Sequence, residues 1–252
     1  MTIQMGYFTA NGHRLAYRAQ GSGPLLLILP GNTSSSAWHE GELQHFSGRY
    51  HAAALDFLGT GQSERLAIWP ENWWKHGALD ALALIEALGE EQAVLVGTSG
   101  GAVAALWAAI LAPERVRAVV ADSTGEFADP ELLRAEIGNR AYKTPEQASF
   151  WRKAHGEDWE QVVEADNQIC MALAARGGDW FGGRLYEIHC PVLFSASLRD
   201  DLLPDLREQL PRMAAQVADG YVFLCGGAGA HPLMWSRPAE FRTAADAFLN
   251  LI

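Results

Sequence analysis

Residues 94–104 of the chain read VLVGTSGGAVA, an apolar run that passes through glycine and serine into an alanine-rich segment. The pattern G-x-S-x-G is formed by Gly97, Ser99 and Gly101. A sharp turn from strand to helix needs such small residues beside the serine, because neighbouring backbone comes too close there for a Cβ atom. The turn would lift the Ser99 hydroxyl above the sheet and direct the Gly100 N–H, at the positive end of a helix, toward an anion formed beside it. We therefore predict that Ser99 is a nucleophile; the alternative is a turn of the same shape without chemistry.

Eight short stretches have the character of β-strands. The first two, residues 6–10 and 14–18, flank Asn11-Gly12, and Asn-Gly supplies the positive φ angles of a two-residue hairpin turn. The others are short apolar runs, most of them separated by segments of helical periodicity: residues 25–29, 51–55, 93–96, 116–121, 192–196 and 221–225. Strand and helix in alternation predict an α/β fold of the doubly wound type, a mostly parallel sheet with helices on both faces.

Residues 125–187 interrupt this alternation, because they contain several helical patterns and no convincing strand. Connections between elements are usually a few residues long, so an interval of this size predicts a structured insertion. We expect residues 1–124 and 188–252 to form the main domain and residues 125–187 to form a helical cap, or lid, over it. The aromatic residues of the interval include Trp151, Trp159 and Trp180. These tryptophans either line a substrate pocket or pack the cap on the main domain, and both interpretations stay open.

Composition and charge exclude several classes of protein. With 252 residues, of which 49% are hydrophobic and 19% charged, the chain has ample apolar surface for a core and is not disordered. The net charge of −11 argues against a nucleic-acid partner, since such binding comes mainly from Lys and Arg on phosphates. The longest apolar stretch, residues 102–112, is shorter than the ~20 residues of a membrane span. The three cysteines are far apart and form no CxxC pair, so we expect reduced thiols and a cytoplasmic protein. We also expect no metal and no cofactor.

Two further segments make the chain resemble the α/β-hydrolase superfamily over nearly its whole length. Residues 29–32 read LPGN, where such proteins carry a His-Gly-x turn after the third strand, although Pro30 stands in place of the histidine. Residues 56–63 read DFLGTGQS and match the family loop D-x-x-G-x-G-x-S. The resemblance implies an eight-stranded, mostly parallel sheet with a helical cap. It also implies that the backbone N–H groups of Asn32 and Gly100 form the oxyanion hole.

The resemblance places the catalytic acid and base after the serine, in the order Ser, Asp or Glu, His. Residues 191–204, PVLFSASLRDDLLP, resemble the acid loop and indicate Asp200. Its neighbour Asp201 and the earlier Asp122, after the preceding strand, are the alternatives. The base is His231, the only histidine after the last strand pattern, in a glycine-rich loop that lets the imidazole reach over the sheet edge. We interpret six other histidines as ordinary hydrogen-bonded or solvated side chains: His39, His45, His51, His76, His155 and His189.

These residues predict a serine hydrolase for a small ester-like molecule. His231 would take the proton of Ser99 as the hydroxyl attacks a carboxylic ester or lactone, Asp200 would hold the imidazole in its working tautomer, and water would release the acyl group. Two alternatives stay open: a hydrolase that cleaves carbon–carbon bonds in dienoate ring-fission products with the same triad, and a receptor-like member of the fold that binds a ligand. Epoxide hydrolases and haloalkane dehalogenases need a carboxylate at position 99 and are therefore disfavoured.

Overall fold

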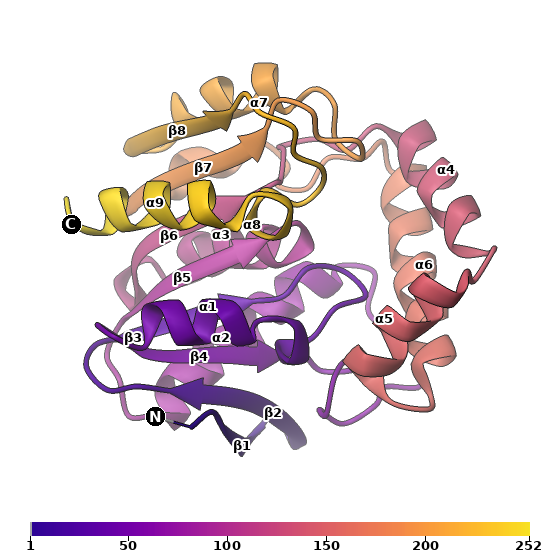
Figure 1. Ribbon diagram of the computed structural model, residues 1–252, viewed down its shortest axis with the longest axis horizontal. Helices are drawn as coiled ribbons and strands as arrows, with labels where there is room; N and C mark the ends of the chain where they lie inside the picture. The colour runs from indigo at the N-terminus through magenta and orange to yellow at the C-terminus, as the bar shows by residue number, and fades with distance from the viewer. Residues whose placement is uncertain (1) are drawn as a thin grey trace.

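The computed structural model describes residues 2–252 and contains one eight-stranded sheet. Its strands are β1 (Gln4–Ala10), β2 (His13–Gln20), β3 (Leu25–Leu29), β4 (His51–Asp56), β5 (Ala93–Thr98), β6 (Val116–Asp122), β7 (Pro191–Ser197) and β8 (Asp219–Cys225). Their order across the sheet is β1-β2-β4-β3-β5-β6-β7-β8 (Figure 1). β1 pairs antiparallel with β2, β2 pairs antiparallel with β4, and the remaining pairs are parallel. The mostly parallel sheet predicted from the apolar runs is confirmed.

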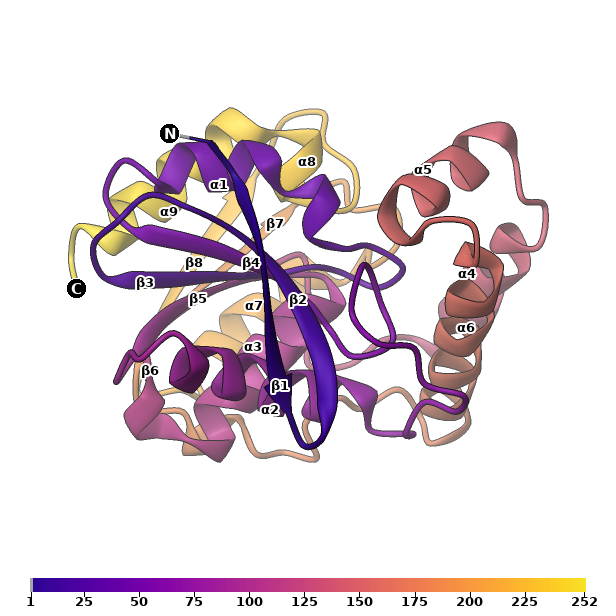
Figure 2. The ribbon, with the colours of Figure 1, turned by 90° about the horizontal axis from the view of Figure 1, so that it is seen from below.

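Two layers of helices cover the sheet, one on each face (Figure 2). One face carries α1 (Glu40–Phe46), α8 (Leu233–Ser236) and α9 (Pro238–Leu249), and the other carries α2 (Trp73–Ala87), α3 (Gly100–Leu111) and α7 (Leu206–Ala214). Short 3₁₀ helices cover Ser36–Trp38, Pro113–Arg115 and Leu185–Glu187.

The third strand shows why its sequence is apolar throughout. Leu25, Leu27 and Leu29 pack in the core beneath α2 and α3. Leu26 and Ile28 pack in the core beneath α1 and α9. Because successive strand residues point to opposite faces, a strand that is covered on both faces has no position that faces solvent.

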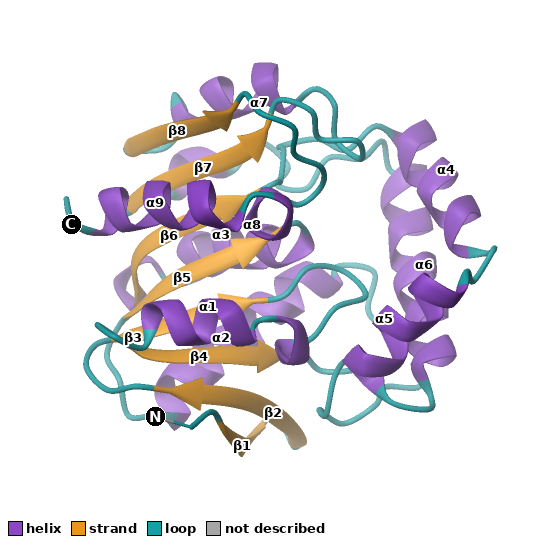
Figure 3. Ribbon diagram, in the orientation of Figure 1, coloured by secondary structure: helices purple, strands orange, loops and turns teal. Residues whose placement is uncertain are grey.

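Residues 125–187, called the cap from here on, carry three helices beyond the carboxyl ends of the parallel strands (Figure 3). They are α4 (Pro130–Arg140), α5 (Pro145–His155) and α6 (Trp159–Ala175). Local sequence sets their ends: the Asp129 carboxylate caps α4, and Thr144 and Gln147 form a capping box at the start of α5. Gly156 follows α5 with a φ of 87°, which favours glycine. Among residues 2–252, no helix combines the length and the apolar character that a membrane crossing demands.

Asp80 is an acidic residue buried in α2, and we expect it to make the stability of the fold depend on pH. Its carboxylate accepts a hydrogen bond from the Leu58 N–H (2.9 Å), but burial disfavours the charged form and raises the pKa to about 7. A carboxyl whose pKa is higher in the folded protein than in the unfolded chain stabilises the fold below its unfolded pKa. This contribution is lost as the pH rises through the folded pKa.

Replacing Asp80 with Asn keeps an acceptor for Leu58 and removes the ionisation. The free energy of unfolding of Asp80→Asn, taken relative to that of the wild type, should therefore increase by roughly 2 kcal/mol as the pH rises from about 5 to 8. Denaturant unfolding at several pH values in this range measures the gain. Glu86→Gln, at an exposed position of the same helix, is the control and should run parallel to the wild type. A difference between Asp80→Asn and the wild type that does not change with pH contradicts the prediction.

Candidate active site

Ser99 forms the turn between two elements by itself, since β5 ends one residue before it and α3 begins one residue after it. Its φ of 51° lies in the left-handed region, which is sterically unfavourable for a residue with a side chain. The flanking glycines are required by space. A Cβ on Gly97 would overlap the carbonyl oxygen of Gly101, and one on Gly101 would overlap that of Leu29. The turn therefore has the shape that the G-x-S-x-G pattern predicts.

The structure brings the side chains of Ser99, His231 and Asp200 into hydrogen-bond contact. His231 Nε2 lies 2.9 Å from Ser99 Oγ, and His231 Nδ1 lies 2.9 Å from Asp200 Oδ2. Asp200 is 5% exposed, and its other oxygen, Oδ1, accepts hydrogen bonds from the N–H groups of Leu202 (3.1 Å) and Leu203 (2.7 Å). The backbone thus fixes Oδ1 and leaves Oδ2 for the imidazole. A neutral His231 with its proton on Nδ1 can then accept the Ser99 proton at Nε2.

The two alternative carboxylates lie close by and contact other parts of the loop that carries His231. Asp201 Oδ1 accepts a hydrogen bond from the backbone N–H of His231 (2.8 Å). Asp122 is fully buried at the end of β6 and accepts hydrogen bonds from two side-chain hydroxyls and from the Met234 N–H (3.0 Å). Burial raises the pKa of Asp122 to about 6. Of the three candidate acids, Asp200 is the one in contact with the imidazole ring.

Asn32 and Gly100 carry two unpaired N–H groups beside Ser99. Within residues 2–252, neither backbone N–H donates a hydrogen bond to another residue. The turn that carries Asn32 lies against the serine, because a Cβ on Gly31 would be 3.2 Å from Ser99 Cβ. The side chain of Asn32 is held by Trp74, whose Nε1 donates to Asn32 Oδ1 (2.9 Å). Both residues line the same cavity as Ser99, so the two N–H groups are available to an oxygen atom bound there.

A cavity of about 50 Å³ lies between Ser99 and the cap. Its wall is mostly apolar and is formed by Ala128, Leu133, Ile137, Cys170, Trp180, Leu202 and Leu203. Glu136 and Arg140 are the charged residues in this wall, and Arg140 Nη1 pairs with Oδ1 of the buried Asp166 (2.6 Å). Pockets for small molecules usually measure about 300–1,000 Å³. This cavity therefore has room only for a small chemical group unless the cap moves.

The three cap tryptophans have different surroundings. Trp180 lines the cavity beside Ser99 and meets Trp74 edge to face, with the ring centroids 4.6 Å apart. Trp151 and Trp159 are 4% and 5% exposed, stack on each other and pack against Val163. Neither belongs to the described wall of the cavity. Of the two interpretations that the sequence left open, Trp151 and Trp159 therefore fit packing, since they join α5 to α6, and Trp180 fits the lining of a pocket.

Replacing Trp151 or Trp159 with Ala should lower stability without changing selectivity. Loss of a large buried aromatic side chain costs about 3–5 kcal/mol, which corresponds to a fall in Tm of roughly 10 °C. Trp180→Ala should instead reorder kcat/KM among ester chain lengths with a smaller fall in Tm. Thermal unfolding and a series of p-nitrophenyl esters measure the two effects. An unchanged chain-length profile in Trp180→Ala would show that Trp180 does not shape the cavity for substrate.

Sequence reasoning did not single out the cavity residues on α4. Leu133, Glu136, Ile137 and Arg140 follow the i, i+3, i+4, i+7 spacing that places residues on one face of a helix. The spacing identifies the face, but only the docking of α4 shows that this face points to Ser99. No signal in the sequence distinguishes it from a face packed on the core.

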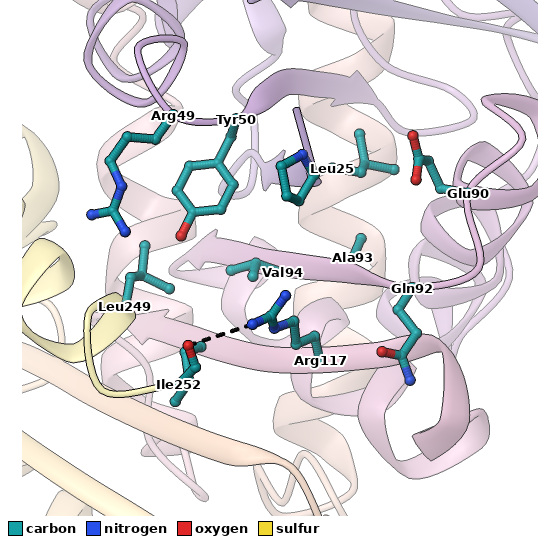
Figure 4. Close-up of a pocket in the computed structure, with 11 residues that line it drawn as sticks. Leu25, Arg49, Tyr50, Glu90, Gln92, Ala93, Val94, Arg117, Leu249 and Ile252 are labelled. Carbon is teal, nitrogen blue, oxygen red and sulfur yellow. Dashed lines mark hydrogen bonds between the residues drawn. The ribbon is translucent and has the colours of Figure 1, made fainter. Parts of the chain in front are cut away.

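Another cavity, of about 280 Å³, lies at the amino ends of β3 and β5 (Figure 4), whereas Ser99 follows the carboxyl end of β5. Arg49, Tyr50 and Arg117 lie in its wall, and none of the residues expected to act in catalysis lines it. No group of three or more His, Cys, Asp or Glu side chains within residues 2–252 is arranged to hold a metal ion.

Comparison with known proteins shows the family. The model of the alpha/beta hydrolase fold family matches residues 24–170, which is more than half of the chain, and the protein belongs to this family. The matched stretch includes Ser99 and the turn that carries Asn32. The resemblance that the sequence motifs indicate is confirmed.

Several known proteins are similar to this chain. The 2-(acetamidomethylene)succinate hydrolase of Mesorhizobium japonicum is 36% identical over 135 residues, which are 53% of this chain and 45% of that protein. The chain thus aligns with less than half the length of this relative. The crystal structure of E-2-(acetamidomethylene)succinate hydrolase is similar with a TM-score of 0.76 and 25% identity, over 99% of this chain and 100% of that one. The enol-lactonase of Burkholderia xenovorans LB400 shares the fold with a TM-score of 0.75 and 18% identity, over 97% and 100% of the two chains. The protein is a hydrolase of this fold.

Proposed function

We propose that the protein hydrolyses a small carboxylic ester or lactone through an acyl-enzyme intermediate on Ser99. The observation that carries the proposal is the contact of His231 with Ser99 Oγ and with Asp200 Oδ2, at 2.9 Å in both cases. A serine hydroxyl is a weak nucleophile at neutral pH unless a base lies within hydrogen-bond reach. The arrangement supplies that base, a carboxylate to orient it, and free backbone donors beside it.

The proposed reaction begins when His231 accepts the Ser99 proton at Nε2 and the hydroxyl oxygen attacks the substrate carbonyl. Asp200 keeps a proton on Nδ1 and stabilises the imidazolium that forms. The carbonyl oxygen becomes an oxyanion that accepts hydrogen bonds from the Asn32 and Gly100 N–H groups, each worth on the order of 3 kcal/mol. His231 then gives its proton to the leaving alkoxide, and water, activated by the same histidine, releases the acid.

The size of the cavity and the named relative support a small substrate. A cavity of about 50 Å³ with a mostly apolar wall favours a short acyl chain. The similar 2-(acetamidomethylene)succinate hydrolase is named for a small molecule, and we propose a small-molecule substrate here as well. The three cysteines are buried and unpaired, in keeping with a reducing compartment such as the cytoplasm.

A substrate screen on the purified protein tests the proposal. The panel contains p-nitrophenyl esters of increasing acyl length, lactones, and a dienoate ring-fission product. We expect turnover that is highest for short acyl chains, and labelling by a fluorophosphonate probe that peptide mapping places on Ser99. Turnover of the dienoate without ester turnover would instead support a carbon–carbon bond hydrolase. An active enzyme in which Ser99 is never labelled would overturn the proposal.

A further inference from the structure

His155 in the cap joins two loops of the main domain beside the active site. It is the last residue of α5 and is 2% exposed. Its Nδ1 lies 3.0 Å from the Gly61 nitrogen, and its Nε2 lies 3.0 Å from the Thr33 carbonyl oxygen. An amide N–H can only donate and a carbonyl can only accept, so the imidazole is neutral with its proton on Nε2. Burial agrees with this state, because it lowers the pKa of His155 to about 4.

Thr33 belongs to the same tight turn as Asn32, whose N–H is a proposed oxyanion donor. The Ser34 N–H donates to the Gly31 carbonyl (3.1 Å), which places Asn32 and Thr33 at the two central positions of the turn. Thr33 has a φ of 56°, a conformation that favours glycine and that surrounding contacts must hold in place. The hydrogen bond from His155 Nε2 to the Thr33 carbonyl is such a contact, and it comes from the cap.

Further hydrogen bonds attach the same end of α5 to the main domain. Ser35 Oγ donates to the Ala154 carbonyl (2.8 Å), and Arg65 Nη2 donates to the His155 carbonyl (2.8 Å). Arg65 also binds the Asp158 carboxylate through Nε (2.8 Å) and Nη2 (3.0 Å). The carboxyl end of α5 is therefore fixed on the main domain. Among these bonds, the one from the His155 ring reaches the backbone of the turn that carries Asn32.

We propose that His155 is a positioning residue of the active site, which acts through the Thr33 carbonyl to hold the Asn32 N–H in place as an oxyanion donor. The hydrogen bond that joins the cap to Thr33 thus also completes the oxyanion hole. The inference rests on the proposed function, because the Asn32 N–H matters to rate only if an oxyanion forms at Ser99.

Replacing His155 with Ala removes the support from Thr33 and should lower kcat for p-nitrophenyl acetate by roughly 10- to 100-fold. KM should change much less, because an oxyanion donor acts on the transition state more than on the bound ester. The affinity for a trifluoromethyl ketone, which forms a tetrahedral oxyanion adduct with the serine, should fall by a similar factor. Ser35→Ala removes a neighbouring hydrogen bond between cap and main domain and leaves the His155 ring bonds, so it should keep kcat.

Two amide variants separate positioning from packing. A Gln side chain at position 155 can place its amide nitrogen near the former Nε2 and donate to Thr33, whereas the shorter Asn can accept from the Gly61 N–H and does not reach Thr33. We expect His155→Gln to recover most of kcat and His155→Asn to stay low, with thermal unfolding showing that both are folded. These two variants decide the question even if His155→Ala does not fold.

The outcomes separate this inference from the proposed function. If the wild type turns over esters and folded His155→Ala and His155→Asn keep its kcat, His155 does not position the donor and the inference is overturned. The inference would also be overturned if His155→Gln and His155→Asn lost kcat equally and in proportion to their loss of Tm. A wild type with no ester turnover and no labelling of Ser99 overturns the proposed function, and this inference with it.

Discussion

Ser99→Ala is expected to lower kcat by roughly 10⁴- to 10⁶-fold while the protein stays folded. The hydroxyl is the atom that His231 contacts, at 2.9 Å, and the proposed acyl-enzyme cannot form without it. The backbone at position 99 should accept alanine, because its φ of 51° is no less favourable for an alanine than for a serine. The measurements are kcat with the best ester of the panel, thermal unfolding, and mass spectrometry after treatment with the fluorophosphonate.

The matched control for this variant is a serine far from the site. Ser47 follows the last residue of α1, and its hydroxyl donates to the nearby Gln44 carbonyl (3.0 Å). Ser47→Ala should keep both kcat and labelling. If Ser99→Ala keeps more than about one-hundredth of the wild-type kcat, an acyl-enzyme on Ser99 cannot be the main route, since loss of a nucleophile costs far more than that.

The fold could be predicted because its decisive signals are local in sequence. A strand buried on both faces reads as a short apolar run, as β3 does with five consecutive leucine and isoleucine residues. The turn at Ser99 demands glycine two positions before and after it, where the backbone of other segments leaves no room for a Cβ. The capping residues Asp129 and Thr144 mark helix starts in the cap in the same local way.

The parts of the site that escaped prediction depend on contacts between distant residues. Trp180 and Trp151 belong to the same interval of sequence, and only the docking of the helices decides that one lines the cavity and the other packs inside the cap. His155 is bonded to residues 94 and 122 positions away, so its sequence neighbours contain no sign of its role. The acid loop did indicate Asp200, but only the structure shows that Asp200 contacts the His231 ring while its neighbour Asp201 contacts the backbone of His231.

Asp200→Asn is expected to lower kcat by about 10⁴-fold, because the amide forces the imidazole into the wrong tautomer. Asp200 Oδ1 accepts hydrogen bonds from the Leu202 and Leu203 N–H groups, so the oxygen of an Asn side chain must occupy that place. Its NH₂ group then faces His231 Nδ1 at the position of Oδ2. A ring nitrogen that accepts from this NH₂ has no proton, so the proton of the neutral ring sits on Nε2. His231 can then only donate to Ser99, and the base of the proposed reaction is lost.

An Asp-to-Asn substitution at either alternative acid should lower kcat much less, because an amide can replace the carboxylate in the hydrogen bonds that Asp201 and Asp122 make. Asp201 accepts a single backbone N–H through Oδ1, and an amide oxygen can replace that carboxylate oxygen. Asp122 accepts from Met234 N–H on one oxygen and from the Ser195 hydroxyl on the other (2.7 Å), and a hydroxyl can turn to accept from an amide instead. The kcat of both variants should therefore stay within roughly 10-fold of the wild-type value, because they leave the imidazole tautomer unchanged. Tm is measured for both variants to show that they are folded. A larger fall for Asp201→Asn or Asp122→Asn than for Asp200→Asn would mean that the carboxylate in contact with Nδ1 is not the one that orients the base.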